Sequence, residues 1–176
     1  YLYDYDITLV AVWTPNNYTI TFEVNGGELE AYTMVVTYDE SYELPTPTRT
    51  GYTFDGWYTS ETGRTKVTSA TVVNLSQDQI LYARWKANTY TVKYNGNGAT
   101  SGSTASSTHT YDTYKTLTAN GFSKTGYTFL GWSEDANATT ATYIVGQPVK
   151  NITTEGEITL YAIWEPNSYT VVYMGN

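Results

Sequence analysis

RTGYTFDGW, at residues 49–57, returns almost unchanged as KTGYTFLGW at residues 124–132. The two copies place Gly51 and Gly126 75 residues apart. A phrase that recurs at such a distance indicates a structural repeat, in which each copy builds the same unit. The sequence therefore predicts at least two copies of one folded module.

A second phrase marks the end of each copy. ITLVAVW ends at Trp13, QILYARW ends at Trp85 and ITLYAIW ends at Trp164, so these tryptophans are 72 and 79 residues apart. A similar continuation follows each of them, as TPNNYTITF, KANTYTVKY or EPNSYTVVY. The repeat is thus 70 to 80 residues long, which is close to the smallest size at which a domain builds its own core.

These phrases divide the chain into two complete modules and two partial ones. Residues 14–86 form the first predicted module, and residues 87–165 form the second. Residues 1–13 match the tail of an upstream repeat, and residues 166–176 match the start of a downstream repeat. We therefore expect a segment of a tandem array.

Each module has the pattern of short β-strands. Tyr18, Ile20 and Phe22 alternate with polar residues in YTITFEV, which is typical of a strand with one wet face. The NGG at residues 25–27 tolerates positive φ and predicts a hairpin that returns through YTMVVTY. No stretch has a sustained helical period, although a short helix near residues 71–76 is compatible with the pattern. The predicted fold is mainly β, or α+β at most, with little helix.

The repeated phrase is predicted to supply the core of each module. Gly51 and Gly56 flank a short apolar strand, where glycine favours a bend or a close approach of the backbone. A buried tryptophan removes a large apolar area from water, so Trp57 and Trp132 should stabilise their modules strongly. The predicted core anchors are Trp13, Tyr52, Phe54, Trp57, Trp85, Tyr127, Phe129, Trp132 and Trp164.

Composition limits the classes of function. The 176 residues carry a net charge of −8, which repels nucleic-acid phosphates, and no apolar run has the length of a membrane span. Cysteine is absent, so neither a disulfide nor a thiolate metal site is available. We expect no nucleic-acid partner, no membrane insertion, no metal and no cofactor.

The stretch YTITFEVNGG … LPTPTRTGYTFDGW … LYARW resembles the Listeria–Bacteroides repeat, the B-repeat family found in internalin B and other bacterial surface proteins. The resemblance covers residues 14–86, while residues 87–165 resemble a related subtype with LTANGFSKTGYTFLGW. It implies a compact β-grasp-like module, strung in tandem on a secreted or cell-wall-anchored bacterial protein. Such repeats act as spacers and are sometimes implicated in host contact. The family has no catalytic residues to carry over.

Few residues offer catalytic chemistry. His109 is the one histidine and lies in a Ser/Thr-rich stretch without a counterpart in the first module, so we expect a solvated loop residue rather than a triad member. The acidic pairs Glu134–Asp135 and Glu155–Glu157 do not recur between modules, which is typical of surface solubility groups. NGNG at residues 95–98 follows a strand but opens no helix, which favours a turn over a phosphate loop. We predict that the chain is not an enzyme.

Exposed tyrosines leave a binding function open. Tyr58, Tyr82 and Tyr161 alternate with core-facing neighbours. An adhesion module could contact a host protein or a glycan through these tyrosines or through the loops at residues 95–109 and 133–142. Tyrosine is also a good cross-strand partner on the wet face of a sheet, which needs no ligand. The pattern alone does not separate these two interpretations.

The leading hypothesis is an extracellular, semi-rigid spacer or stalk that displays other domains. Only KANT separates Trp85 from Tyr90, so the neighbouring repeats of the same chain are the first expected partners. Each terminal strand lacks the rest of its own repeat, and exposed strand edges recruit other strands. We therefore also expect that copies of the chain can associate end to end through these strands.

Overall fold

The structure is a computed structural model that describes residue 6 and residues 8–63, 65–68 and 76–175. Within this part of the chain it contains strands and turns but no helix, so the mainly β prediction is confirmed. The short helix considered near residues 71–76 lies, except for its last residue, outside the described residues. The strands are β1 (Asn17–Glu23), β2 (Thr33–Thr37), β3 (Tyr52–Tyr58), β4 (Lys66–Val67), β5 (Gln79–Ala87), β6 (Thr89–Asn95), β7 (Ser101–Gly102), β8 (Ser107–Thr110), β9 (Lys115–Thr116), β10 (Phe122–Ser123), β11 (Tyr127–Ser133), β12 (Pro148–Val149) and β13 (Gly156–Pro166).

Packing divides the described chain into two compact units. Unit 1 takes the described residues of 1–48 and 54–85, and unit 2 takes those of 49–53 and 86–176. Residues 49–53 thus belong by sequence to the first predicted module and by packing to unit 2. The module boundaries drawn from the sequence remain a prediction.

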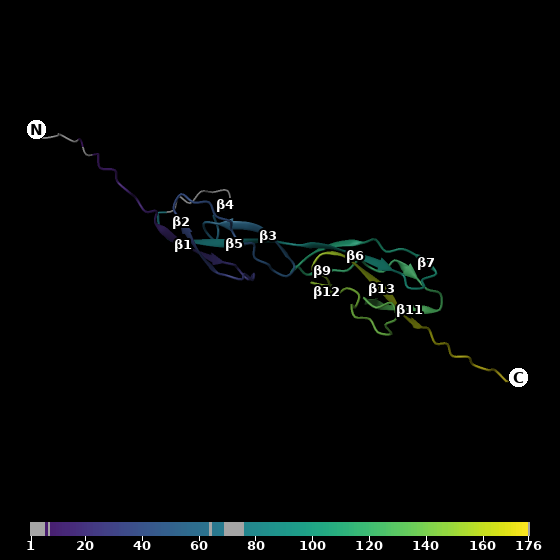
Figure 1. The fold of residues 1–176 in the computed structure, drawn as a ribbon. Coiled ribbons are helices and arrows are strands. Elements are labelled where there is room, and N and C mark those ends of the chain that lie inside the picture. Colours follow the sequence, from purple (N-terminus) through teal and green to yellow (C-terminus); the bar gives the residue numbers. More distant parts are fainter. Residues whose placement is uncertain (1–5, 7, 64, 69–75, 176) are drawn as a thin grey trace, which may run out of the picture. The chain divides into compact units, whose positions relative to one another are not determined.

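Unit 1 is built on a mixed sheet with the order β2-β1-β5-β3-β4 (Figure 1). β1 pairs antiparallel with β2 and parallel with β5, so the opening and closing strands of the module are direct neighbours. Asn25 and Gly26 adopt φ angles of 48° and 82° where the chain leaves β1. The turn closes when the Gly27 N–H donates to the Val24 carbonyl at 3.0 Å. The hairpin predicted at the NGG is therefore confirmed.

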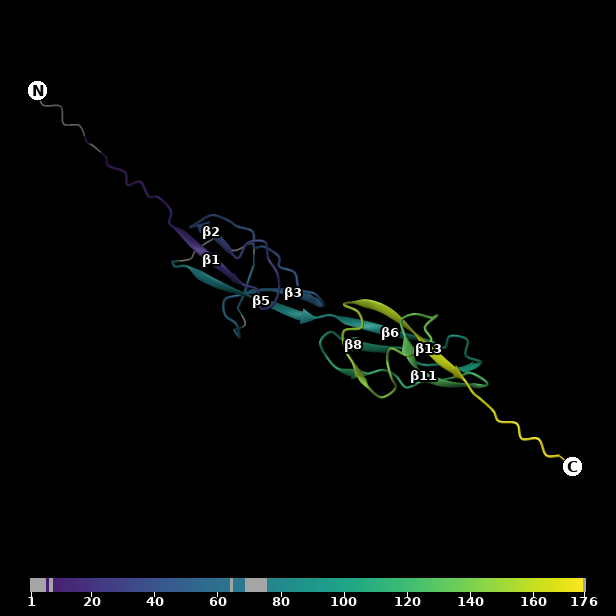
Figure 2. The ribbon, with the colours of Figure 1, turned by 90° about the horizontal axis from the view of Figure 1, so that it is seen from below.

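Unit 2 repeats this arrangement (Figure 2). Its main sheet has the order β11-β13-β6-β8, in which β6 is antiparallel to β8 and parallel to β13. These four strands correspond to β3, β5, β1 and β2 of unit 1. Two small antiparallel pairs, β7 with β10 and β9 with β12, complete the unit. The β-grasp-like assignment stays a prediction, since the described residues of neither unit include a helix packed across its sheet.

Each unit has its own hydrophobic core around one tryptophan. In unit 1 the Trp57 ring is 2% exposed and packs against Phe22 and Phe54, with centroid distances of 4.7 and 5.5 Å. In unit 2 the Trp132 ring is 1% exposed and packs against Phe129 at 5.0 Å. Tilted and edge-on ring pairs of this kind add to the stabilisation gained from burial. The repeated phrase thus places one aromatic cluster in each unit.

The second glycine of the repeated phrase lies at a bulge in β11. The pairing of β11 with β13 shifts register between Phe129 and Gly131, and Gly131 adopts a φ of 152°. A Cβ atom at Gly131 would lie 2.5 Å from the carbonyl oxygen of Tyr143. Gly56 has a φ of 149° at the equivalent place in β3. A close approach of the backbone is therefore present at Gly131, whereas Gly56 is approached by the side chain of Lys66.

His109 is not the solvated loop residue that the sequence predicts. It lies in β8, is 1% exposed and stands opposite Tyr90 of β6. The same register in unit 1 places Val36 opposite Tyr18, so His109 does have a counterpart, at a core position. The Ser/Thr-rich composition concealed this strand, although β-branched threonine suits a pleated surface well.

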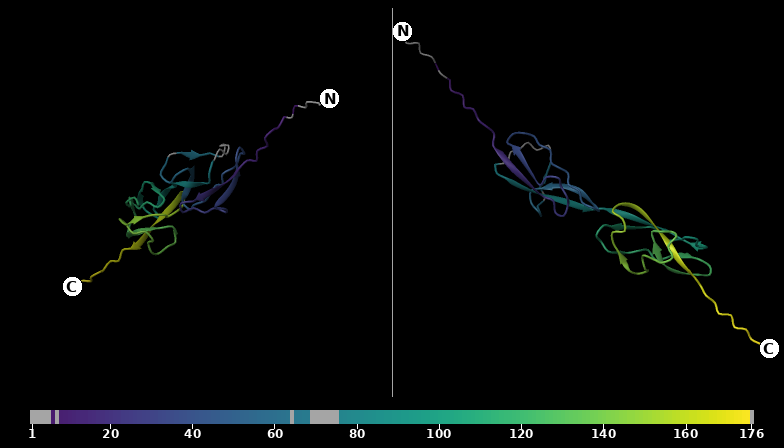
Figure 3. Two further views of the ribbon diagram at one scale, coloured as in Figure 1. Left: turned by 90° about the vertical axis from the view of Figure 1, so that its left-hand side faces the viewer. Right: turned by 60° about the horizontal axis from the view of Figure 1, so that its bottom comes forward.

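The segments at either end of the described chain form no strand (Figure 3). Residues 8–16 and 167–175 contain no residue of any strand, although Asn16 and Asn167 at their inner ends form backbone hydrogen bonds with Tyr38 and Gly126. Trp13, predicted to anchor a core, is 87% exposed, because the described residues place no strand beside it. Its counterparts Trp85 and Trp164 are half-buried at the edges of the two cores. End-to-end association through these segments stays a prediction.

Candidate functional site

The other predicted core anchors differ in how deeply they are buried. Tyr52 is half-buried and Tyr127 is 41% exposed. Each is the first residue of its strand, β3 or β11, and precedes the apolar part of the repeated phrase. The remaining anchors lie in or against the two cores: Phe54, Trp57, Trp85, Phe129, Trp132 and Trp164. Tyr52 and Tyr127 therefore lie nearer to the surface than these remaining anchors do.

One tyrosine considered for ligand contact is already engaged within the protein. Tyr58, at the end of β3, donates its hydroxyl to Asp55 Oδ2 at 2.5 Å. This bond raises the pKa of Tyr58 and lowers the pKa of Asp55. The Arg84 guanidinium lies 4.0 Å from the centroid of the Tyr58 ring. A cation thus covers one face of the ring, and that face is not open to a sugar.

Tyr82 and Tyr161 hold equivalent positions in β5 and β13, and both are half-buried. Tyr82 lies opposite Glu23, and Tyr161 lies opposite Asn95, in the parallel strand pairs. Unit 1 places Tyr58 and Tyr82 on neighbouring strands, whereas Tyr161 belongs to unit 2. Neither unit by itself brings all three rings together. A role for these tyrosines in binding stays a prediction.

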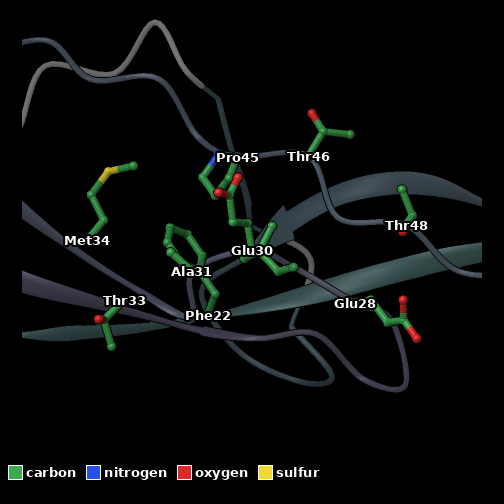
Figure 4. A pocket seen from close by; sticks show the side chains of 10 residues that line it. Phe22, Glu28, Glu30, Ala31, Thr33, Met34, Pro45, Thr46 and Thr48 are labelled. Carbon is green, nitrogen blue, oxygen red and sulfur yellow. The ribbon is translucent and has the colours of Figure 1, made fainter.

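A pocket in unit 1, which the sequence did not predict, is a candidate binding site (Figure 4). It has a volume of about 830 Å³ and lies between the segment that follows β1 and the segment that precedes the repeated phrase. Backbone hydrogen bonds of 2.8 and 3.0 Å between Glu28 and Thr48 join these two segments. Figure 4 shows Thr33 and Met34 at one end of the pocket and Glu28 and Thr48 at the other.

Apolar and acidic side chains share this pocket. Phe22, Ala31 and Met34 supply apolar surface, while Glu28 and Glu30 are exposed carboxylates. Such a lining suits a ligand with an apolar body and a cationic group. It contains no histidine or lysine that could pair with a carboxylate for proton transfer. This lining makes the pocket a candidate binding site.

Unit 2 differs from unit 1 in the region that corresponds to this pocket. Phe122 of β10 stands where unit 1 has Pro47, and its ring packs edge-on against Trp132 at 6.3 Å. β10 pairs with β7, where unit 1 has a single bridge between Glu28 and Thr48. Unit 2 has a separate pocket of about 250 Å³, lined mainly by the turn at residues 95–102 and by Phe122. The two modules therefore present different surfaces here, a point that the sequence left open.

In unit 2, the buried His109 and the half-buried Ser107 form a hydrogen-bonded pair. His109 Nε2 lies 2.9 Å from Ser107 Oγ, which in turn lies 2.9 Å from the Tyr94 hydroxyl. The His109 ring stacks on Tyr90, with centroids 5.4 Å apart. Its Nδ1 is buried and has no hydrogen-bond partner among the described residues, so no carboxylate orients the ring as in a catalytic triad. Burial, with a smaller contribution from Lys115, lowers the pKa of His109 and favours its neutral form.

A single residue connects the closing strand of the first module to the opening strand of the second. β5 and β6 are separated by Asn88 alone. The Asn88 N–H donates to the Gly51 carbonyl at 2.9 Å, and its Oδ1 accepts from the Thr53 hydroxyl at 2.6 Å. These contacts lie within unit 2, which includes residues 49–53. Both the backbone and the side chain of Asn88 are therefore held.

The described residues lack two further kinds of feature. In that part of the chain no three His, Asp or Glu side chains come together as a group that could hold a metal ion. The same residues provide no helix of the length and apolarity needed to cross a membrane.

The model of the Listeria–Bacteroides repeat domain matches the chain twice, over residues 18–84 and 90–163. Each match begins in an opening strand, β1 or β6, and ends in a closing strand, β5 or β13. The two matches therefore correspond to the two main sheets, and together they cover more than half of the chain.

Relatives that align with the chain are much longer than it is. A "putative Gly-rich membrane protein" of Evansella cellulosilytica is 34% identical over 175 residues, which are 97% of this chain and 19% of that protein. A "putative membrane protein" of the same organism is 36% identical over 172 residues, or 97% of this chain and 24% of that protein. Internalin H of Listeria monocytogenes is 44% identical over 84 residues, or 47% of this chain and 15% of internalin H. The chain thus spans less than a quarter of each of these proteins.

Proposed function

The chain belongs to the Listeria–Bacteroides repeat family, and we propose that its modules are non-enzymatic spacers in a bacterial surface protein. Residues 14–86 and 87–165 are, in this proposal, folded segments of an extracellular stalk that displays other domains. The names of the relatives, an internalin and two membrane proteins, support a location at the cell surface. The partners that this role requires are the neighbouring repeats.

The observation that carries the proposal is the held connection at Asn88. A spacer keeps its length when its modules do not fold back on free linkers, and linker freedom grows with the number of unrestrained residues. Here the connection is one residue long, and its hydrogen bonds to Gly51 and Thr53 restrain both its backbone and its side chain. This restraint supports a semi-rigid stalk.

A surface-display experiment tests the spacer role. A reporter domain is attached to a bacterial surface through residues 14–165, or through an unrelated pair of rigid β modules of similar length. The spacer role predicts that both linkages present the reporter equally to a large soluble probe and that deleting the modules reduces probe binding. Reporter function that survives only with residues 14–165, at equal surface density, would contradict a spacer and indicate specific contacts.

Adhesion is a second candidate function, and the pocket of unit 1 is the observation that favours it. Its carboxylates and apolar lining suit a cationic group on a host protein or glycan. A glycan array and host-cell surface extracts, screened at physiological salt, should then give saturable binding. Changing Glu28 and Glu30 to Gln should remove that binding, whereas Glu43→Gln, at an exposed acid outside the pocket lining, should not. No binding by a folded sample would leave the spacer role alone.

A further inference from the structure

The corner at residues 49–53, where β3 begins, is covered within unit 2. A Cβ atom on Gly51 would lie 2.3 Å from the Tyr111 ring, so the backbone of the corner touches that ring directly. The Tyr52 hydroxyl donates to Asp112 Oδ2 at 2.7 Å, and the Tyr52 and Tyr111 rings meet edge to face at 5.7 Å. The corner is thus paired with a turn formed by Tyr111 and Asp112.

The repeated phrase forms an equivalent corner at residues 124–128. The Gly126 carbonyl accepts from the Asn167 N–H at 2.8 Å, and the Thr128 hydroxyl donates to Asn167 Oδ1 at 2.7 Å. These are the same two bonds that Asn88 makes at the first corner. Both corners are therefore built in the same way by the residue that follows a closing strand.

The second corner, unlike the first, is uncovered in the described part of the chain. A Cβ atom on Gly126 would meet no atom within 4 Å, and Tyr127 is 41% exposed. The φ of Gly126 is 78°, close to the 76° of Gly51, so the backbone has the same form in both corners. The Lys124 ammonium lies 4.4 Å from the Tyr127 ring centroid, as the Arg49 guanidinium lies over the tyrosine of the first corner. This second corner thus keeps the features of an interface while lacking the turn that covers it.

The turn at Tyr111 and Asp112, which covers the first corner, has a counterpart in unit 1 at Tyr38 and Asp39. Asp39 has a φ of 62° and repeats the left-handed conformation of Asp112, whose φ is 58°. Tyr38, which precedes it, is 39% exposed. A pocket of about 400 Å³ lies beside this turn and is lined in part by Asn16, the counterpart of Asn88. In unit 2 the corresponding space, beside Asn88 and Tyr111, is filled by the first corner at residues 49–53.

We propose that the corner at residues 124–128 is a docking surface for the Tyr–Asp turn of the repeat that follows it, with residues 167–175 as that repeat's opening strand. The inference rests on the proposed function in one respect, the presence of further repeats in a stalk. Gly126 leaves room for a tyrosine ring against the backbone, and the Tyr127 hydroxyl supplies a donor for the aspartate. By the same contact, the pocket beside Tyr38 receives the corner of a preceding repeat.

A chain with a third repeat tests this docking. Residues 169–176 are replaced by a second copy of residues 90–165, so that a copied Tyr111 and Asp112 stand in the same sequence relation to the second corner as the originals do to the first. Tyr127→Phe should then lower the hydrogen-exchange protection of the copied repeat about five- to tenfold, since it removes a hydrogen bond to a carboxylate. In the original chain the same substitution should change the protection of unit 2 by less than about twofold, because no described residue there offers the hydroxyl such an acceptor. Tyr52→Phe is the matched control and should lower the protection of unit 2 in both chains.

A double-mutant cycle decides the outcome. Tyr127→Phe and an Asp→Ala change at the copied Asp112 should be coupled by about threefold or more, as residues in direct contact are. Additive effects, or a Tyr127→Phe effect of the same size in both chains, would overturn the docking. Such a failure is distinguishable from failure of the spacer role. The coupling between Tyr52 and the original Asp112 reports the first corner independently, and the display experiment reports the spacer.

Discussion

Trp132 is the residue on which the stability of unit 2 depends most clearly. Its indole is 1% exposed and contacts the rings of Tyr94, Phe122 and Phe129. Trp132→Ala should therefore cost about 3–5 kcal/mol in unfolding free energy, measured by urea denaturation, because it leaves a cavity among these rings. The control Trp13→Ala should cost less than about 0.5 kcal/mol, since Trp13 is 87% exposed. Equal midpoints for Trp132→Ala and the parent would show that the core is assigned wrongly.

His109 should make the stability of unit 2 depend on pH. Burial lowers its pKa below the ordinary value of 6.5, so at acidic pH the unfolded state binds the proton more readily than the folded state. The contribution of neutral His109 is therefore complete above pH 6.5 and is lost as the pH falls below that value. The unfolding free energy should change with pH by at most about 1.4 kcal/mol per pH unit. Urea denaturation monitored through unit 2 between roughly pH 5 and 7.5 measures it.

The first module supplies the matched variant for this measurement. Val36 occupies the place of His109 in unit 1, so His109→Val should fold and should lose the slope between about pH 5 and 7. If the dependence of stability on pH persists in this variant, other groups cause it.

At the residue scale, the sequence contained the signal that His109 is in a strand, because TYD at residues 37–39 and 110–112 aligns it with Val36. The Ser/Thr-rich composition around it favoured a loop and hid that alignment.

At the scale of elements, the strands that the sequence predicts best are those with a period of two. Alternation in YTITFEV gave β1, and the NGG turn gave its antiparallel pairing with β2. The parallel pairing of β1 with β5 was not predictable in the same way, because it joins segments about 60 residues apart and depends on the whole sheet. The pocket beside Glu28 was missed for a related reason. It depends on how two irregular segments meet, and no periodic pattern reports that.

The bulge glycines give a prediction at the element scale. Alanine at Gly131 would bring Cβ within 2.5 Å of the Tyr143 carbonyl oxygen, which belongs to the backbone and can move little. Alanine at Gly56 would meet the flexible Lys66 side chain instead, at a similar φ. Gly131→Ala should therefore destabilise unit 2 by at least about 1 kcal/mol more than Gly56→Ala destabilises unit 1. Hydrogen exchange resolved by unit measures both, and an equal cost would mean that the backbone contact is unimportant.

For the whole molecule, the repeated phrases predicted a tandem array, and the two family matches over residues 18–84 and 90–163 confirm the repeat. The sequence did not show that residues 49–53 pack within unit 2, because that assignment follows from contacts of Gly51, Tyr52 and Thr53 rather than from the repeat period. These contacts restrain Asn88 within unit 2. The stalk account therefore depends on the behaviour of Asn88 and the corner beside it.

The distance distribution between two spin labels, one in each unit, tests this account most directly. The chain has no cysteine, so Glu43→Cys and Thr139→Cys, at exposed positions of units 1 and 2, give unique labelling sites. The control carries a short Gly/Ser insertion after Asn88, which frees the connection. A held connection predicts one narrow distribution in the parent that broadens with the insertion. A parent distribution as broad as that of the insertion variant would contradict a semi-rigid stalk.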